Sequence, residues 1–146
     1  LKVMRVSSKG RYAVTAIVFL AKQDRKTPMS LAQIADLHEI SLSYLEQLFS
    51  KLRAAGIVKS IRGPGGGYIL SRSPNEIFIS DIIGAVEIPN PERKLNKTDT
   101  TVLWESLGNQ VFGFLRSISV EDICEQRIEA IETEANDNSF SFAVAR

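Results

Sequence analysis

Hydrophobic residues recur at three- and four-residue intervals near the start of the chain, and this is the spacing of an amphipathic helix. In residues 8–22 the apolar side chains fall on one face, so this stretch is predicted to form the first helix. A polar turn follows, and Ser30 with Gln33 then matches the capping box that marks a helix start. The pattern therefore predicts a short second helix over residues 31–37.

A third amphipathic helix is predicted shortly after the second. Its apolar positions share one face, and they are Leu45, Leu48, Phe49 and Leu52. Ser41 suits the N-cap, as does Ser43 because Glu46 completes a capping box with it, and Gly56 stands where a glycine ends a helix. Two short helices joined by a tight turn form the helix-turn-helix pattern.

The period changes from helical to extended after residue 56. Residues 57–61 and 68–70 are β-prone, and they flank the glycine-rich segment 62–67. This arrangement predicts a β-hairpin with a glycine-rich tip. A helix that begins with Ser80 as its N-cap and runs through Glu87 would follow the hairpin.

The chain beyond residue 87 begins with a polar stretch, residues 88–99, in which Pro89 and Pro91 indicate a linker or loop. Residues 100–117 are then predicted to form a long amphipathic helix. Its apolar stripe consists of Val102, Leu103, Leu107, Val111, Phe114, Leu115 and, just beyond, Ile118, with Trp104 beside it. A helix of this kind, attached to a small completed domain, needs another surface against which to bury the stripe.

One more helix start lies near the end of the chain. Ser119 and Asp122 have the spacing of a capping box and predict a short final helix over residues 120–131. The tail from residue 133 onward is rich in asparagine and serine, and we predict that it is loosely ordered.

These elements predict a mainly α-helical fold with a small β wing. Residues 4–87 would form a winged helix-turn-helix domain, and residues 88–99 a linker or loop. Residues 100–132 would hold the long amphipathic helix, which the family resemblance described below makes a dimerisation helix, together with the final helix, and residues 133–146 would form the tail. A chain of 146 residues suits one core of this kind with an appendage.

Charge divides the chain into two halves. Residues 1–73 contain 12 Lys and Arg against 4 Asp and Glu, a net charge of +8, whereas residues 74–146 contain 6 against 13, a net charge of −7. A basic half is the surface that phosphate contact requires, and an acidic half would be repelled by DNA. The asymmetry therefore favours nucleic-acid binding by the N-terminal half.

Composition argues against several other classes of protein. The longest apolar run, residues 13–21, is interrupted by Thr15 and is far shorter than the roughly 20 residues that span a bilayer, so we predict no membrane segment. The first residues lack a signal-peptide pattern, which predicts a cytoplasmic protein. One cysteine and one histidine form neither an intramolecular disulfide nor the usual structural zinc site. The usual hydrolase and metalloenzyme motifs are missing from the sequence, so we expect no enzyme.

The candidate chemistry lies at the start of the third predicted helix. In helix-turn-helix proteins the second helix of the motif enters the major groove, with its N-terminal residues against the base edges. The predicted reading set is Ser41, Ser43, Tyr44, Glu46 and Gln47. Glutamine pairs with adenine, glutamate accepts from cytosine, and hydroxyl groups bond phosphates or bases. The alternative is a capped, solvated helix start without a DNA role.

The hairpin tip strengthens the DNA-binding interpretation. Gly63 and the neighbouring glycines leave the backbone free to approach a ligand closely, and Arg62 suits the strong negative potential of a narrow minor groove. A nucleotide-binding phosphate loop is disfavoured, because no Lys-Ser/Thr pair follows the glycines and no helix begins there.

Three segments of the chain resemble one known family of regulators. They are residues 4–14 (MRVSSKGRYAV), 41–49 (SLSYLEQLF) and 61–68 (IRGPGGGY), and a looser similarity runs from Leu103 and Trp104 to residues 117–122. On these motifs the chain resembles the winged helix-turn-helix transcriptional regulator family typified by the iron–sulphur cluster regulator IscR.

The resemblance implies a homodimer that binds double-stranded DNA. In this family the long C-terminal helices cross, and each winged domain reads one half of a palindromic operator. The resemblance places the predicted reading set in the major groove, and Arg62 with Gly63 in the minor groove.

The chain departs from this family at the cluster site. Cluster-binding members carry three cysteines, usually with a histidine, before the dimer helix, whereas residues 86–103 contain neither Cys nor His. We therefore predict no cofactor, because carboxylates and amides are poor ligands for iron–sulphur clusters. Cys124 is expected to be a small buried thiol, with an exposed redox-sensing thiol as the alternative. His38 is expected to be solvated or to contact phosphate, with an atypical cluster held by His38 and Cys124 as the alternative.

The sequence thus favours a cluster-free dimeric repressor, similar to the branch of the family that represses cysteine metabolism. In that branch, control is implied to come from a partner enzyme or from thiol chemistry, and the acidic C-terminal half offers a surface for a regulatory protein partner. Two alternatives stay open. One is an iron–sulphur sensor with atypical ligands, and the other is a protein-interaction adaptor that has kept the fold but lost DNA binding.

Overall fold

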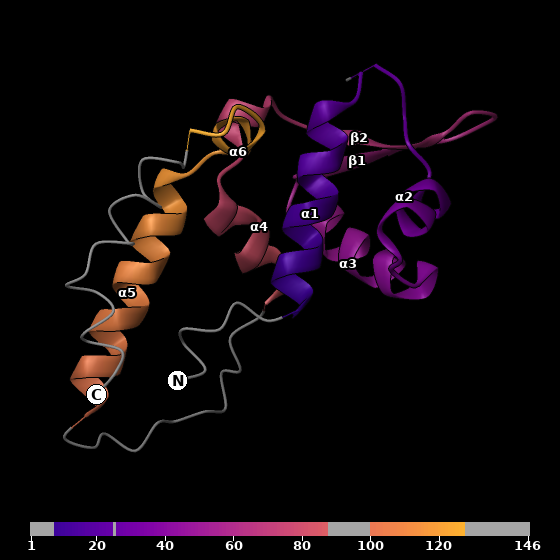
Figure 1. Cartoon of the computed structure of the whole chain (residues 1–146). Helices are drawn as coiled ribbons and strands as arrows, with labels where there is room; N and C mark the ends of the chain where they lie inside the picture. Colours follow the sequence, from indigo (N-terminus) through magenta and orange to yellow (C-terminus); the bar gives the residue numbers. More distant parts are fainter. Residues whose placement is uncertain (1–7, 25, 88–99, 128–146) are drawn as a thin grey trace.

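Six α-helices and a two-stranded sheet make up the part of the chain that the computed structural model describes, which is residues 8–24, 26–87 and 100–127. In chain order the elements are α1 (Ser8–Lys22), α2 (Leu31–His38), α3 (Leu42–Ala54), β1 (Val58–Ile61), β2 (Gly67–Leu70), the 3-10 helix η1 (Pro74–Glu76), α4 (Ile79–Val86), α5 (Thr101–Ser117) and α6 (Val120–Cys124). Figure 1 shows α5 standing to one side of the other helices, while the hairpin extends from the opposite side. The predicted fold class, mainly helical with a small β wing, is confirmed.

The helix-turn-helix begins where its capping residues place it. Ser30 Oγ accepts a hydrogen bond from the Gln33 N–H at 3.2 Å, and the Ser30 N–H donates to Gln33 Oε1 at 2.9 Å. At the start of α3 the hydroxyl of Ser41 accepts from the Tyr44 N–H at 3.2 Å, so Ser41 rather than Ser43 is the N-cap. Gly56 follows the end of α3 at φ +77°, a left-handed conformation that suits glycine.

Two predicted boundaries are wrong. Ser80 is not the N-cap of α4; it is buried within the first turn, because Phe78 is the N-cap and its N–H donates to the Asp81 carboxylate at 3.0 Å. The final helix ends at Cys124, well before residue 131, since the chain soon turns with Gln126 in a left-handed conformation at φ 57°. The predicted linker at 88–99 and the tail at 133–146 lie outside the described residues.

One hydrophobic core joins the helix-turn-helix to the segment between α5 and α6. The core draws on α1, α3 and α4, and it also takes in Ile118 and Val120, which are 6% and 0% exposed. The backbone of this segment pairs with the chain before α4: the Ile79 N–H donates to the Ile118 carbonyl at 2.9 Å, and the Val120 N–H donates to the Ile77 carbonyl at 2.8 Å. The C-terminal end of α5 is therefore fixed against the part of the chain that contains the helix-turn-helix and the wing, residues 8–87.

The hairpin is attached to the helix-turn-helix by a second backbone pairing. Strands β1 and β2 pair antiparallel, and Tyr68 of β2 also exchanges hydrogen bonds of 2.8 and 3.0 Å with Met29, which lies just before α2. A Cβ atom at Gly67 would overlap the Met29 backbone, so only glycine permits this approach. On the other side the Tyr68 ring meets Phe49 of α3 edge-on, at 5.0 Å between ring centres. The wing is thereby held at a fixed position beside α3.

Candidate nucleic-acid interface

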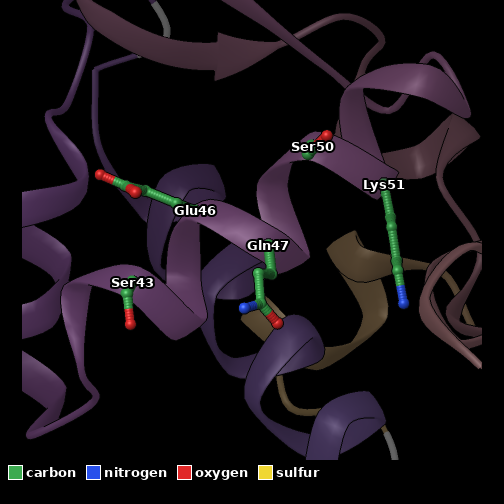
Figure 2. A pocket seen from close by; sticks show the side chains of 5 residues that line it. All are labelled: Ser43, Glu46, Gln47, Ser50 and Lys51. Atoms are coloured by element: carbon green, nitrogen blue, oxygen red, sulfur yellow. The ribbon is translucent and has the colours of Figure 1, made fainter.

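The outward face of α3 forms a shallow, open hollow. It is lined by Ser43, Glu46, Gln47, Ser50 and Lys51. In Figure 2 the side chains of Ser43, Gln47 and Lys51 point to one side of the helix, as expected for residues four apart, and Glu46 points to another. The buried apolar side chains of α3 lie on the opposite face and are at most 2% exposed, namely Leu45, Leu48, Phe49 and Leu52. The structure thus gathers three members of the predicted reading set on one exposed polar surface.

Ser50 and Lys51 belong to this surface although the sequence interpretation left them out. They follow Glu46 and Gln47 by four residues each, so helical spacing was the signal that could have found them. Arg53 is also exposed in the last turn of α3, and the first turn carries no acidic residue. Cations at the end of the helix add to the positive charge available for phosphate contact.

Ser41 combines two functions at the edge of this surface. Its hydroxyl oxygen accepts the hydrogen bond that caps α3, yet the residue stays exposed. A hydroxyl that accepts one hydrogen bond can still donate its own proton. Ser41 is therefore positioned both to hold the start of α3 and to donate to a phosphate oxygen.

Tyr44 is more enclosed than the other members of the predicted reading set. It is half-buried, and its ring meets Tyr12 of α1 edge-on at 5.8 Å and 86°. Burial, together with the neighbouring Tyr12, raises the pKa of the Tyr44 phenol. A tyrosine phenol is protonated at neutral pH in any case, and the raised pKa keeps Tyr44 protonated in more alkaline solution as well. The phenol is therefore a hydrogen-bond donor, which can bond a phosphate oxygen or an acceptor on a base edge.

The two predicted wing residues lie at the exposed tip of the hairpin. Arg62 and Gly63 are both exposed, and Gly63 adopts φ +105°, which residues with a side chain rarely take. The Gly66 N–H donates to the Gly63 carbonyl at 2.9 Å and closes the turn. Figure 1 shows this tip projecting beyond the helices, away from α5. Arg62 therefore stands exposed at the tip of the wing.

The two candidate ligands for an atypical cluster, His38 and Cys124, belong to no metal-binding group in the described residues. The ring of His38 packs edge-on against Phe19 at 5.0 Å, and its Nε2 is buried without a hydrogen-bond partner, so this nitrogen is not solvated. The residue as a whole is half-buried, and its contact with phosphate stays a prediction. Cys124 is half-buried against the core, and this burial raises the pKa of its thiol. Within the described ranges no three His, Cys, Asp or Glu side chains are grouped so that they could hold a metal ion. This donor set does not fit an iron–sulphur cluster, which needs thiolates.

The chain is similar in sequence to known regulators. The model of the Rrf2 family, described as an iron-dependent transcriptional regulator, matches residues 6–126. The HTH-type transcriptional regulator IscR of Photorhabdus laumondii is 43% identical over 129 residues, which cover 82% of this chain and 79% of the relative. The regulator of the same name from Xenorhabdus nematophila is 44% identical over 133 residues, with 85% and 81% covered.

Solved structures agree with this similarity. CymR, the global cysteine regulator of B. subtilis, matches with a TM-score of 0.72 at 40% identity, covering 84% of this chain and 98% of CymR. IscR of T. potens matches with a TM-score of 0.73, also at 40% identity, covering 87% and 90%. No helix in the described part of the chain has the length and apolarity to span a bilayer. The chain belongs to the Rrf2 family of DNA-binding transcriptional regulators, which are not enzymes, and it has their winged helix-turn-helix fold.

Proposed function

We propose that this regulator is a cluster-free repressor that binds a palindromic operator as a homodimer in the cytoplasm. The observation that carries the proposal is the exposed polar face of α3 beside a wing whose position is fixed by its pairing with Met29. A helix and a hairpin held side by side can enter a major groove and the adjacent minor groove together. Repression follows if the bound dimer covers the promoter.

Each candidate residue has a role that its position supports. Gln47 would pair with adenine and Glu46 would accept from cytosine, while Ser43 would bond a base or a phosphate. At the edge of the face Ser41 and Tyr44 would donate to phosphates, as their geometry favours. The minor groove would receive Arg62, with the Gly63 backbone in close contact.

The proposal of a homodimer rests on the unpaired apolar face of α5. Leu103 and Phe114 are 59% and 42% exposed, and Leu107 lies between them at helical spacing. Leu115, on another side of α5, packs against the core, so the exposed strip does not serve the fold of a single copy. A second copy of α5 would cover this strip, and the crossing of the two helices would set the distance between the two reading helices.

The absence of a cluster is tested on protein purified without oxygen. We expect a colourless protein without stoichiometric iron or sulphide, because Cys124 is the one thiol in the sequence and lies half-buried against the core. The measurement is a visible spectrum with iron and sulphide assays, on the wild type and on Cys124→Ala. A brown protein whose absorbance disappears in Cys124→Ala would show an atypical cluster. A colourless protein leaves a regulatory partner or thiol chemistry as the source of control.

DNA reading is tested by replacing one residue in each groove. Gln47→Ala and Arg62→Ala should each lower operator affinity by roughly 1 to 3 kcal/mol per half-site, the value of a good base contact. The probe is the tightest-binding duplex selected from a randomised library, and affinity is measured by fluorescence anisotropy. Gln23→Ala and Arg116→Ala are matched controls, because both residues are exposed and neither lies on α3 or the wing. An adaptor that had lost DNA binding would select no sequence and would be indifferent to all four changes.

A further inference from the structure

Leu42 is a large apolar residue exposed on the reading helix. It occupies the first position of α3, between Ser41 and Ser43, and 43% of its surface is exposed. The core face of α3 is already filled by residues that are at most 2% exposed, namely Leu45, Leu48, Phe49 and Leu52. The side chain of Leu42 is therefore not required to complete the core.

The position of Leu42 on the helix assigns it to one edge of the reading face. Leu42 and Glu46 are four residues apart, so they lie on the same side of α3, and Glu46 lines the exposed hollow. Phe49, a further three residues on, turns toward the wing, where its ring meets Tyr68. Tyr44 marks the opposite edge, because its ring meets Tyr12 of α1. Leu42 thus lies at the wing-side edge of the polar face.

The first turn of α3 is suited to close approach to DNA. It contains no acidic residue, although acidic residues are favoured at helix N-termini, where they interact with the helix dipole. A carboxylate there would be repelled by the phosphates on either side of the groove. An aliphatic side chain in this turn brings neither a charge nor a hydrogen-bonding group to the base edges.

We propose that Leu42 recognises thymine by packing against its C5-methyl group in the major groove. The inference rests on the proposed function, since it assumes that α3 enters that groove. The C5-methyl of thymine is the apolar feature of the base edges there, and apolar side chains are its usual partners. Leu42 would select thymine over cytosine at the base that it contacts. Glu46, one turn further along α3, would accept a hydrogen bond from cytosine at a different base. Recognition of pyrimidines would be shared between these two residues.

The test removes the methyl group from the DNA and the side chain from the protein. The duplex selected by the wild type is resynthesised with deoxyuridine in place of thymidine, one symmetric pair of positions at a time. At one pair, wild-type affinity should fall about fourfold per half-site, the value of burying one methyl group, and therefore about 15-fold for the palindrome. Leu42→Ala should bind the thymine duplex more weakly by a similar factor and show no further loss with deoxyuridine at that position.

Leu37→Ala is the matched control. Leu37 is 62% exposed but lies on α2, so this variant should respond to deoxyuridine as the wild type does. Thermal unfolding followed by circular dichroism verifies that Leu42→Ala is folded, which is expected because alanine favours helices. The inference is overturned if deoxyuridine has no effect on the wild type at any position, or if its effect persists undiminished in Leu42→Ala. Failure of the proposed function would be visible earlier, because the wild type would then select no duplex.

Discussion

Replacing Leu103 and Phe114 together by glutamate should convert the protein to monomers and lower its affinity for a palindromic operator by at least about 100-fold. Both residues lie on the exposed strip of α5, at 59% and 42% exposure. In a dimer, burial of this strip would bring four carboxylates into an apolar interface, where unpaired charges are very costly. A monomer would keep them in water, so the dimer should be destabilised while the fold of each copy is retained.

The loss of DNA affinity follows from the geometry of two linked reading heads. In a dimer, the second half-site is bound at the high effective concentration that the α5 pair imposes, and this typically adds a factor of about 10² to 10⁴. A monomer reads one half-site and gains none of this factor. Sedimentation velocity gives the oligomeric state, and binding to duplexes with one or two half-sites separates the loss of avidity from damage to the reading face.

Arg116→Glu is the control for charge. It changes the net charge of the chain by the same two units, and Arg116 is exposed on a different side of α5 from Leu103 and Phe114. This variant should remain dimeric and bind the two-half-site duplex nearly as well as the wild type. A double variant that still sediments as a dimer would show that the exposed strip of α5 is not the interface.

The sequence predicted most of the winged part of the chain because local signals agree there with the tertiary contacts. The Ser30–Gln33 capping box fixes the start of α2, and the apolar period from Leu45 to Leu52 fixes the buried face of α3. Gly56 marks the end of that helix through its left-handed conformation. Where a single residue determines the local backbone, sequence reasoning placed the element correctly.

Local signals did not predict the contacts between distant segments. The backbone pairing of residues 77–79 with residues 118–120 could not be predicted from either segment, because each is only a short, mainly apolar stretch without a motif that indicates its partner. It also explains the wrong start of α4: Phe78 pairs with Ser119, so the helix begins after it and Ser80 is buried. The same limit applies to His38, because its contact with Phe19 of α1 could not be anticipated from a polar-looking turn.

The candidate interface shows the same division. Helical spacing alone would have added Ser50 and Lys51 to the predicted residues. The enclosure of Tyr44, however, depends on Tyr12, which lies on a different helix. The attachment of the wing through Met29 likewise depends on the close approach of the Gly67 and Met29 backbones. The glycine makes this approach possible, but its presence in the sequence does not identify Met29 as the partner.

Phe49→Ala should lower the free energy of unfolding by about 3 to 5 kcal/mol, the usual cost of truncating a buried aromatic residue. The side chain of Phe49 is 0% exposed, and its ring meets Tyr68 edge-on, so it joins α3 to the wing as well as filling the core. Such a loss is a large fraction of the roughly 5 to 15 kcal/mol that stabilises a domain. Urea unfolding followed by circular dichroism measures it.

Phe49→Leu separates the two contributions of this residue. Leucine fills most of the cavity, so unfolding should become easier by only about 1 kcal/mol, but it cannot provide the aromatic edge that faces Tyr68. If that ring contact fixes the wing beside α3, the leucine variant should stay folded and still lose part of the affinity that Arg62 contributes. Arg62→Ala would then weaken operator binding less in the Phe49→Leu background than in the wild type. An equal effect of Arg62→Ala in both backgrounds would mean that the pairing of Tyr68 with Met29 holds the wing without help from α3.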